Sequence, residues 1–302
     1  MFILKSHITI GDLTFNWVNT IEVESSWELL TDKAKIVLPT NVKIETEPGK
    51  HESLNFHQLK DHLKNGDKVE IKVGYDDDLN TIFKGYVSYI KPRVPIEVYC
   101  EDEMIQLKKD PINDSLKDTS ISKLADKHFA KYETDVMNIE LGNYYIPNLT
   151  GAKLLDQFKS DFGLHSFFRD DILVIGKRYN KETANDVSFK LDYNIISDEL
   201  EYKTKDQVKL KVKAISNNPD GSKTEIELGD ADGELRTLNF YNVAKSELKK
   251  VAEAEMERLV YDGWRGSFTA FGVPLVFHGD IVELVYGSES DKTGRYWVDG
   301  VN

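Results

Sequence analysis

The sequence predicts a mainly β protein with an α+β insert, in which a small α+β domain joins two similar antiparallel β-barrels. Three features predict this: alternating apolar and polar residues near both ends, a helical period in the middle, and a thirteen-residue stretch that occurs twice. The predicted domains are residues 1–108, 109–186 and 187–302. A chain of 302 residues is long enough for more than one hydrophobic core.

The first domain begins with strand-like segments. Residues 3–24 alternate in polarity around Gly11-Asp12, which predicts a hairpin, and a further strand over 26–39 stops at Pro39 because proline cannot donate to a ladder. Residues 41–64 break the pattern and are interpreted as an insertion with a short helix near its end. Strands resume at 67–75, 81–90 and 96–102, so the first barrel is expected to end near Lys108.

The middle domain changes to helical spacing. Residues 119–132 carry apolar side chains on one face, with Thr119 or Ser120 as the N-cap, and residues 149–163 form a second helix that stops at Gly163. Residues 164–178 then predict a hairpin around Asp170-Asp171.

The third domain returns to strands from Val187 onward. Strands are predicted over 187–205, 208–216 and 222–230, with a turn at the Asn-Pro-Asp-Gly sequence between the last two. One long helix follows at 243–261, where apolar residues form a continuous stripe. The last strands lie between residue 265 and the end of the sequence.

The repeated stretch links the two β domains. Residues 66–78 read GDKVEIKVGYDDD and residues 279–291 read GDIVELVYGSESD. The matched pairs are Gly66/Gly279, Asp67/Asp280, Val69/Val282, Glu70/Glu283, Gly74/Gly287 and Asp78/Asp291. Turn chemistry alone can produce such a match, but each copy also follows a strand that ends at a proline and precedes an aromatic strand. The shared order favours two similar barrels.

The net charge, the cysteine count and the lack of long apolar runs argue against several classes of function. The formal charge of −13 argues against a protein that binds duplex DNA, because lysine and arginine supply most affinity for phosphate. Cys100 is the single cysteine, so an internal disulfide is impossible and synthesis in a reducing cytoplasm is expected. No apolar run is long enough for a membrane span, and the first residues do not resemble a secretory signal, so no membrane anchor is predicted.

No catalytic, cofactor or metal site is predicted. The acidic clusters lie in turns or at strand ends, where solvated acids are expected; they are Asp76-Asp77-Asp78, Glu101-Asp102-Glu103 and Asp170-Asp171. The histidines of the insertion, His51, His57 and His62, do not share one helical face. Cys100 precedes two acids, which would raise a thiol pKa, so it is interpreted as a buried structural residue.

The motifs resemble a known family. Residues 65–109 combine the Gly-Asp-x-Val strand, the Gly-Tyr-Asp turn, FKGYV and CEDEMIQLKK, and these are similar to the first barrel of phage baseplate hub proteins. Residues 263–301, which follow an AxxExxRL helix, resemble the second barrel. This family includes late control protein D and Mu-like tail proteins, and it is similar to the N-terminal part of type VI secretion spike proteins. The resemblance covers nearly the whole chain in order.

The resemblance implies a structural role in the virion tail baseplate. Such hubs are homotrimers with tail-tube-like barrels and a central channel, which adapt the sixfold tube of a contractile tail to a threefold spike. The implied partners are two further copies, the tail tube protein, the spike protein and other baseplate proteins, with DNA only in passage. The insertion 41–64 is expected to pack poorly on its own barrel and to contact another subunit. The alternative is a tail-associated β-rich peptidoglycan hydrolase or a carbohydrate-binding protein that uses acids such as Glu101, Asp102 and Asp170.

Overall fold

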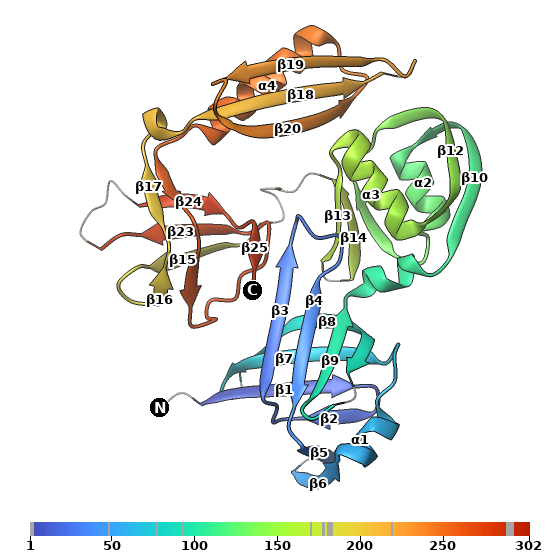
Figure 1. The fold of residues 1–302 in the computed structure, drawn as a ribbon, viewed down its shortest axis with the longest axis vertical. Helices are drawn as coiled ribbons and strands as arrows, with labels where there is room; N and C mark the ends of the chain where they lie inside the picture. The colour runs from blue at the N-terminus through green and yellow to red at the C-terminus, as the bar shows by residue number, and fades with distance from the viewer. Residues whose placement is uncertain are drawn as a thin grey trace.

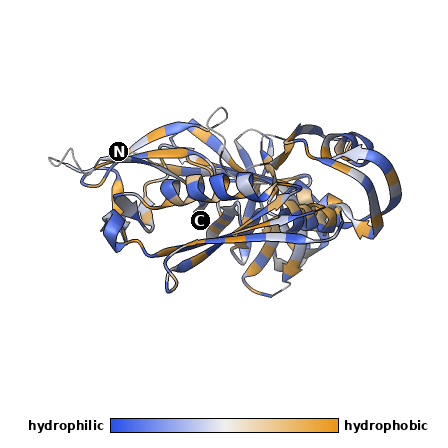
Figure 2. Ribbon diagram, turned by 90° about the horizontal axis from the view of Figure 1, so that it is seen from above, coloured by the Kyte–Doolittle hydropathy of each residue, from blue (hydrophilic) through white to orange (hydrophobic). Residues whose placement is uncertain are grey.

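The computed structural model describes residues 3–47, 49–76, 78–91, 93–169, 171–176, 179, 184–218, 220–287 and 293–302. Figure 1 shows two groups of strands, one built from the N-terminal residues and one from the C-terminal residues, with helix-containing units beside them. Figure 2 shows apolar and polar residues alternating along the strands, as the sequence indicated. Within the described ranges, no helix is long and apolar enough to cross a membrane.

The N-terminal unit is an antiparallel sheet that also takes in the end of the chain. Its strands are β1 (Leu4–Ile10), β2 (Leu13–Phe15), β3 (Thr20–Ser26), β4 (Lys33–Leu38), β5 (Asn41–Glu47), β6 (Lys50–Asn55), β7 (Lys68–Tyr75), β8 (Asp78–Lys91), β9 (Ile96–Glu101) and β25 (Gly300–Val301). Their order is β25-β3-β4-β9-β8-β7-β1-β2-β5-β6. Side chains on one face form the core, among them Ile8, Phe15, Ile36 and Ile71, each fully buried.

The prediction that residues 41–64 pack poorly on their own barrel is wrong. These residues form the β5–β6 hairpin and helix α1 (Phe56–His62), and β5 joins the sheet through the pair Phe15–Ile44. Val42 and Leu59 are fully buried in the core of the sheet. The many charged residues of the segment obscured the alternation that places its few apolar side chains on one face.

The middle unit packs two helices on short sheets. Its elements are a 3-10 helix (Glu103–Lys108), β10 (Pro111–Ser120), α2 (Ile121–His128), β11 (Glu133–Val136), β12 (Glu140–Thr150), α3 (Gly151–Phe162), β13 (His165–Arg169) and β14 (Ile172–Gly176). The Ser120 hydroxyl accepts a hydrogen bond from the Lys123 amide at 3.4 Å, and Gly163 ends α3 with a φ of 69°. The predicted helix cap, helix stop and β13–β14 hairpin are therefore confirmed.

The remaining residues contain two separate clusters of buried side chains. The elements are β15 (Asp186–Lys190), β16 (Ile195–Asp198), β17 (Glu201–Lys203), a 3-10 helix (Lys205–Gln207), β18 (Leu210–Asn217), β19 (Lys223–Gly229), β20 (Glu234–Tyr241), α4 (Lys245–Leu259), β21 (Gly263–Arg265), β22 (Phe268–Ala270), β23 (Ile281–Val285) and β24 (Gly294–Trp297). Helix α4 covers the β19-β18-β20 sheet, at the top of Figure 1, and shares its core. β15 and β23 carry the buried members of the other cluster, and side chains of β16, β21, β22 and β24 pack against it.

Two pairings among the C-terminal strands are parallel, unlike those of an all-antiparallel barrel: β15–β23 and β18–β20. β15 pairs with β23 in parallel, from Asp186–Ile281 to Lys190–Val285, whereas β1 pairs with β7 antiparallel. Parallel neighbours need a long crossover. Here the crossover is the chain between β15 and β23, which includes the α4 layer.

Replacement of Leu59 by alanine is expected to lower the free energy of unfolding by ~2–5 kcal/mol, because it removes a fully buried side chain from the N-terminal core. Urea unfolding measures the change. The control is Asp61→Ala in the same helix, where the side chain is exposed and an effect within about 0.5 kcal/mol is expected. Equal stabilities of the two variants would show that the insertion does not belong to this core.

Candidate functional site

The repeated Gly-Asp sequence forms a tight turn before β7. Gly66 has a φ of 91°, a value that favours glycine. Its amide donates to the Val87 carbonyl at 2.7 Å, and the Val87 amide donates to the Asp67 carbonyl at 2.9 Å. The Asp67 amide donates to the Lys64 carbonyl at 3.2 Å, while the Lys64 amide donates to Asp67 Oδ2 at 2.8 Å. The turn before β7 is thus hydrogen-bonded to Val87 of β8, and the Asp67 carboxylate closes it.

The second Gly-Asp sequence forms the same four hydrogen bonds before β23. Gly279 has a φ of 84°, its amide donates to the Val298 carbonyl at 2.8 Å, and the Val298 amide donates to the Asp280 carbonyl at 3.0 Å. The Asp280 amide donates to the Phe277 carbonyl at 3.2 Å, and the Phe277 amide donates to Asp280 Oδ2 at 2.8 Å. The two turns therefore have the same pattern of hydrogen-bond donors and acceptors, and both have a glycine with a positive φ.

The other matched residues have structural places near these turns. Val69 and Val282 are each 3% exposed and point into the two cores. A Cβ atom at Gly74 would lie 1.8 Å from the Asp78 carbonyl oxygen, so the β7–β8 connection requires glycine there. Gly287 follows β23 with a φ of 33°, and Asp291 lies outside the described residues.

The outward-facing members of the match do not share one site. Glu70 forms an ion pair with Lys72 at 3.1 Å, and Glu283 lies opposite Arg295 in the β23–β24 ladder. The matched residues thus hold two turns and two strands, and they do not converge on a ligand.

Alanine in place of Asp280 is expected to destabilise the protein more than alanine in place of Asp67. Both changes leave a turn amide without its carboxylate, a loss of ~1–3 kcal/mol where the group is buried. Asp280 is 0% exposed and also accepts from the Asn185 amide at 3.0 Å, whereas Asp67 is only half-buried. Urea unfolding of both variants provides the comparison. A larger loss in the Asp67 variant would contradict this account of the turns.

A buried polar cluster adjoins the second turn and joins three parts of the chain. His278, 1% exposed, lies with Nδ1 2.8 Å from Ser25 Oγ at the end of β3. The Ser25 hydroxyl donates to Asp32 Oδ2 at 2.7 Å, and Arg169 of the middle unit donates to the His278 carbonyl at 2.6 Å. Sequence reasoning missed this cluster, although the histidine directly precedes the repeated Gly-Asp, where the first copy has Asn65.

The cluster holds a serine, a histidine and an aspartate, but in an order unlike a hydrolase triad. A triad requires the serine to donate to the histidine and the acid to orient the ring. Here Ser25 donates to Asp32, so the neutral ring donates from Nδ1 to the serine oxygen. Burial, with the nearby Arg169 charge, lowers the pKa of His278 to about 4, which keeps the ring neutral. This geometry connects the units and does not activate Ser25.

Asp102 extends the cluster on the side of the middle unit. Its carboxyl oxygen Oδ1 accepts from the Met104 amide at 3.1 Å and caps the 3-10 helix, while its own amide donates to the Asp32 carbonyl at 3.1 Å. Burial, with a smaller contribution from the Asp32 charge, raises the pKa of Asp102 to about 8. Burial raises the pKa of Asp32 to about 6, against the opposing hydrogen bond from Ser25. Asp102 therefore keeps its proton at neutral pH.

The free energy of unfolding is expected to fall as pH rises from about 6.5 to 8. The folded protein holds a proton on Asp102 in this range, while the unfolded chain, with a pKa near 3.8, does not. The lowered pKa of His278 acts only below pH 6.5. Asp102→Asn should flatten the slope, whereas Asp110→Asn, at an exposed position, should retain it. Urea unfolding at several pH values measures this, and an unchanged slope in Asp102→Asn would overturn the assignment.

The other candidate residues from the sequence lie apart and have structural contacts. Glu101 pairs with Lys108, Glu103 accepts from the Tyr132 hydroxyl at 2.9 Å, and Asp171 lies 3.2 Å from Lys84. Asp77 and Asp170 lie outside the described residues. These acids do not form a pair around a shared substrate position.

The cysteine and the histidines of the insertion have no common site. Cys100 is 2% exposed, and burial raises the pKa of its thiol to about 12, so the prediction of a buried cysteine is confirmed. The His51 ring packs edge-on against Trp17, while His62 is exposed; the side chain of His57 lies outside the description. Within the residues placed by the structure, no group of three histidine, cysteine or acidic side chains can hold a metal ion.

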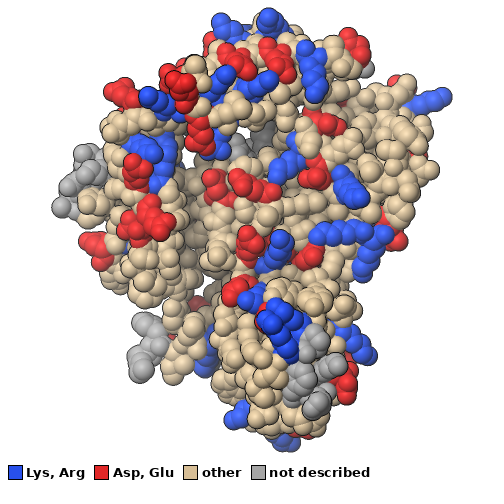
Figure 3. All heavy atoms as spheres, in the orientation of Figure 1, with Lys and Arg blue, Asp and Glu red and all other residues tan. Residues whose placement is uncertain are grey.

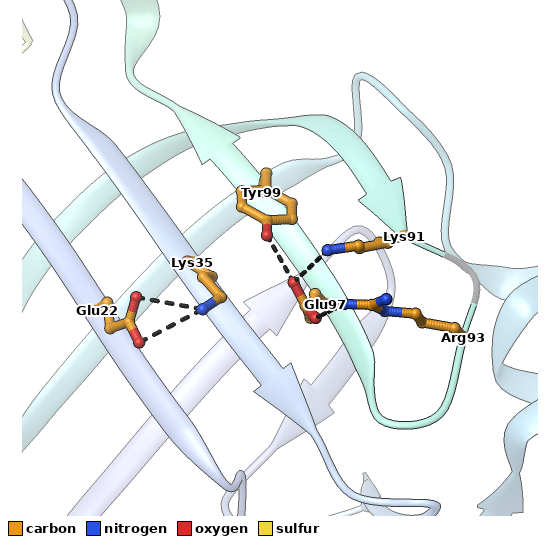
Figure 4. A network of polar contacts seen from close by, with 6 residues as sticks. All are labelled: Glu22, Lys35, Lys91, Arg93, Glu97 and Tyr99. Atoms are coloured by element: carbon orange, nitrogen blue, oxygen red, sulfur yellow. Dashed lines mark hydrogen bonds and ion pairs between the residues drawn. The ribbon is translucent and has the colours of Figure 1, made fainter.

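The outer face around β4 and β9 carries a network of ion pairs and hydrogen bonds (Figure 4). Glu97 accepts from the Tyr99 hydroxyl at 2.6 Å and from Lys91 and Arg93, each at 3.3 Å. The Tyr99 hydroxyl, followed by the two cations, lowers the pKa of Glu97 to about 2. Glu22 and Lys35 pair beside them at 3.4 Å. Glu97 is therefore ionised and paired with cations, and it holds no proton that it could donate in hydrolysis.

The arrangement is similar to solved structures of tail proteins. A tail protein from Neisseria meningitidis MC58 matches with a TM-score of 0.63 and 15% identity, over 98% of this chain and 90% of that one. The 43 kDa tail protein of prophage MuSo2 from Shewanella oneidensis matches with a TM-score of 0.60 and 13% identity, over 99% and 92%. No family model matches the sequence, and neither does any curated protein.

A third similar structure comes from a secretion machine. It is an E. coli component of the type VI secretion system, described as structurally similar to T4 bacteriophage tail proteins, with a TM-score of 0.50 and 9% identity over 99% of this chain and 69% of that one. The chain therefore has the fold of phage tail proteins. This confirms, at the level of the fold, the resemblance that the motifs indicated.

Proposed function

We propose that the protein is the structural baseplate hub of a contractile phage or prophage tail. In this role it assembles as a homotrimer with a central channel and adapts the sixfold tail tube to a threefold spike. The observation that carries the proposal is the pair of Gly-Asp turns with the same four hydrogen bonds, each leading into a core strand of its own β unit. We interpret the two units as copies of one tail-tube-like barrel.

In the proposed role, the duplication allows a threefold assembly to match a sixfold ring. Three chains with two similar units each present six similar surfaces, which match a sixfold ring on one side while the assembly keeps threefold symmetry on the other. The proposed partners are two further copies, the tail tube protein, the spike protein and other baseplate proteins. Such a protein would work in the virion tail after synthesis in the bacterial cytoplasm.

The negative net charge supports a channel through which DNA passes without binding. The chain carries a formal charge of −13, so a channel lined by it would repel phosphates and let the DNA slide. On the face shown in Figure 3, acidic and basic side chains are mixed and form no large basic patch. A duplex-binding surface would require one.

The proposed function needs no catalytic centre. Ser25 and His278 are buried, and the order of hydrogen bonds from the ring to Ser25 and on to Asp32 does not activate the serine. Among the described residues, no observation favours the peptidoglycan hydrolase or the carbohydrate-binding protein over the hub.

A hub trimer is expected to have three times the 34.5 kDa mass of the chain at low micromolar concentration. A permanent assembly of this kind buries more than ~2,000 Å² of total surface, so the mass should persist on dilution and in high salt. Mass photometry and analytical ultracentrifugation provide the measurement, and negative-stain images test threefold symmetry. A monomer that is stable over this range, or hydrolysis of peptidoglycan lost in Asp102→Asn, would contradict the proposal.

A further inference from the structure

One short loop of the N-terminal sheet contacts both of the other parts of the chain. It comprises residues 27–32, between β3 and β4, and is here called the β3–β4 loop. The Trp27 indole donates to Asp299 Oδ1 at 3.0 Å, and the Lys159 ammonium of α3 donates to the Glu28 carbonyl at 2.8 Å. The contacts of the sheet with the middle unit and with the C-terminal strands therefore depend on where this loop lies.

Two carboxyl groups lie where the β3–β4 loop enters the sheet. Asp32 precedes β4 and Asp102 follows β9, and the Asp102 amide donates to the Asp32 carbonyl at 3.1 Å. This bond lies one residue beyond the Lys33–Glu101 pair of the antiparallel β4–β9 ladder. The two acids are thus opposite each other at the end of the ladder, a position where two like charges destabilise strand pairing.

The surroundings of Asp102 favour its neutral form. Its side chain is buried, with 6% of its surface exposed, and Oδ1 accepts a hydrogen bond from the Met104 amide. The nearby cation, Lys108, forms an ion pair with Glu101. A carboxyl group that is buried beside another acid, while the nearby cation pairs elsewhere, keeps its proton.

The surroundings of Asp32 are more polar, so this acid ionises first. Its side chain is half-buried, and the charges that face it are Arg169 of β13 and Glu24 of β3. His278, with a pKa lowered to about 4 by burial, adds no charge above pH 6.5. Burial raises the pKa of Asp32 to about 6, which is below the value of about 8 for Asp102. The pair therefore carries one negative charge at neutral pH.

We propose that the proton on Asp102 acts as a latch for the β3–β4 loop. While the proton is present, no second charge opposes Asp32 at the end of the ladder, and the loop stays in place. When the proton dissociates, two carboxylates face each other, so the end of the ladder opens and the loop moves into water. The contacts of Trp27 and Glu28 with the other two parts of the chain are then released. This latch is independent of the hub function, so a failed trimer test leaves it unaffected.

Release of the loop is expected to increase as pH rises. The closed loop holds a proton on Asp102, whereas the solvated carboxyl group of the open loop, with a pKa near 3.8, has lost it. One proton lost on opening makes the opening equilibrium grow by up to about tenfold per pH unit. The growth is expected between pH 6.5 and about 8, and it levels off above the pKa of Asp102 in the closed loop.

Hydrogen exchange followed by mass spectrometry tests the latch. The Trp27 amide donates to the Asp299 carbonyl at 3.4 Å, so exchange in peptides covering residues 26–32 reports release of the loop. The protein and its Asp102→Asn variant are compared at the same pH, because the intrinsic exchange rates of this segment are then equal. The ratio of their exchange rates is expected to rise by up to about tenfold per pH unit and to level off above about pH 8.

A matched variant and distant peptides serve as controls. Asp110→Asn changes an exposed acid just after the same 3-10 helix and should leave the pH dependence of the loop unchanged. Peptides from β18 and β19 should show no such ratio. A ratio that is constant with pH, or an equal increase in the β18 and β19 peptides, would overturn the latch, since the second result means global unfolding.

The protein itself provides the test if Asp102→Asn fails to fold. Exchange in residues 26–32, corrected for the intrinsic rate at each pH, is then compared with exchange in β7 of the same sheet. The corrected exchange of the loop is expected to increase relative to β7 up to about pH 8 and then to level off. Corrected exchange that does not change with pH would reject the latch.

Discussion

The hydrogen bond between His278 and Ser25 holds the C-terminal β unit against the N-terminal sheet. It joins two buried residues that lie 253 positions apart in the sequence. The neighbouring contacts converge on the same loop between β3 and β4: Trp27 donates to Asp299 at 3.0 Å, and Lys159 of α3 donates to the Glu28 carbonyl at 2.8 Å. The β3–β4 loop is therefore where all three parts of the chain meet.

This polar connection matters because the apolar cores are separate. The buried side chains described by the structure fall into four clusters, and the N-terminal sheet does not share its cluster with the C-terminal strands. Hydrophobic contact is non-directional, whereas hydrogen bonds depend on angle and distance. A few buried hydrogen bonds thus fix how the two β units are oriented. The C-terminal cluster has only Phe189, Val282 and Leu284 as buried members, so that unit depends on its neighbours for stability.

Local geometry explains which parts of the fold the sequence predicted. A Gly-Asp turn needs a positive φ and a nearby carboxylate, and both requirements are satisfied within four residues, so Gly66 and Gly279 could be located without coordinates. The cap at Ser120 and the stop at Gly163 are local in the same way. The packing of residues 41–64 could not be predicted, because their few apolar side chains stand among charged ones and act only through tertiary contacts.

Contacts between residues far apart in the sequence could not be predicted from sequence patterns. The protonated Asp102 stands in an acidic triplet that looks solvated, and only burial beside Asp32 raises its pKa. The parallel β15–β23 pairing and the separate β19-β18-β20 layer depend on where a long crossover packs. Ser25 and Asp32 belong to no recognisable sequence motif, so their hydrogen-bonded cluster with His278 could be found only in the folded structure.

The two turns differ in the residue that precedes the glycine. The residue before the glycine is the buried His278 in the second copy and the exposed Asn65 in the first. Within one chain, the second turn meets the first unit permanently, so a neutral ring can remain buried there. Asn65 of the first turn lies in water, where its amide can hydrogen-bond to solvent. The backbone hydrogen bonds of the turn are the same in both copies, so the residue before the glycine can vary with what each turn contacts.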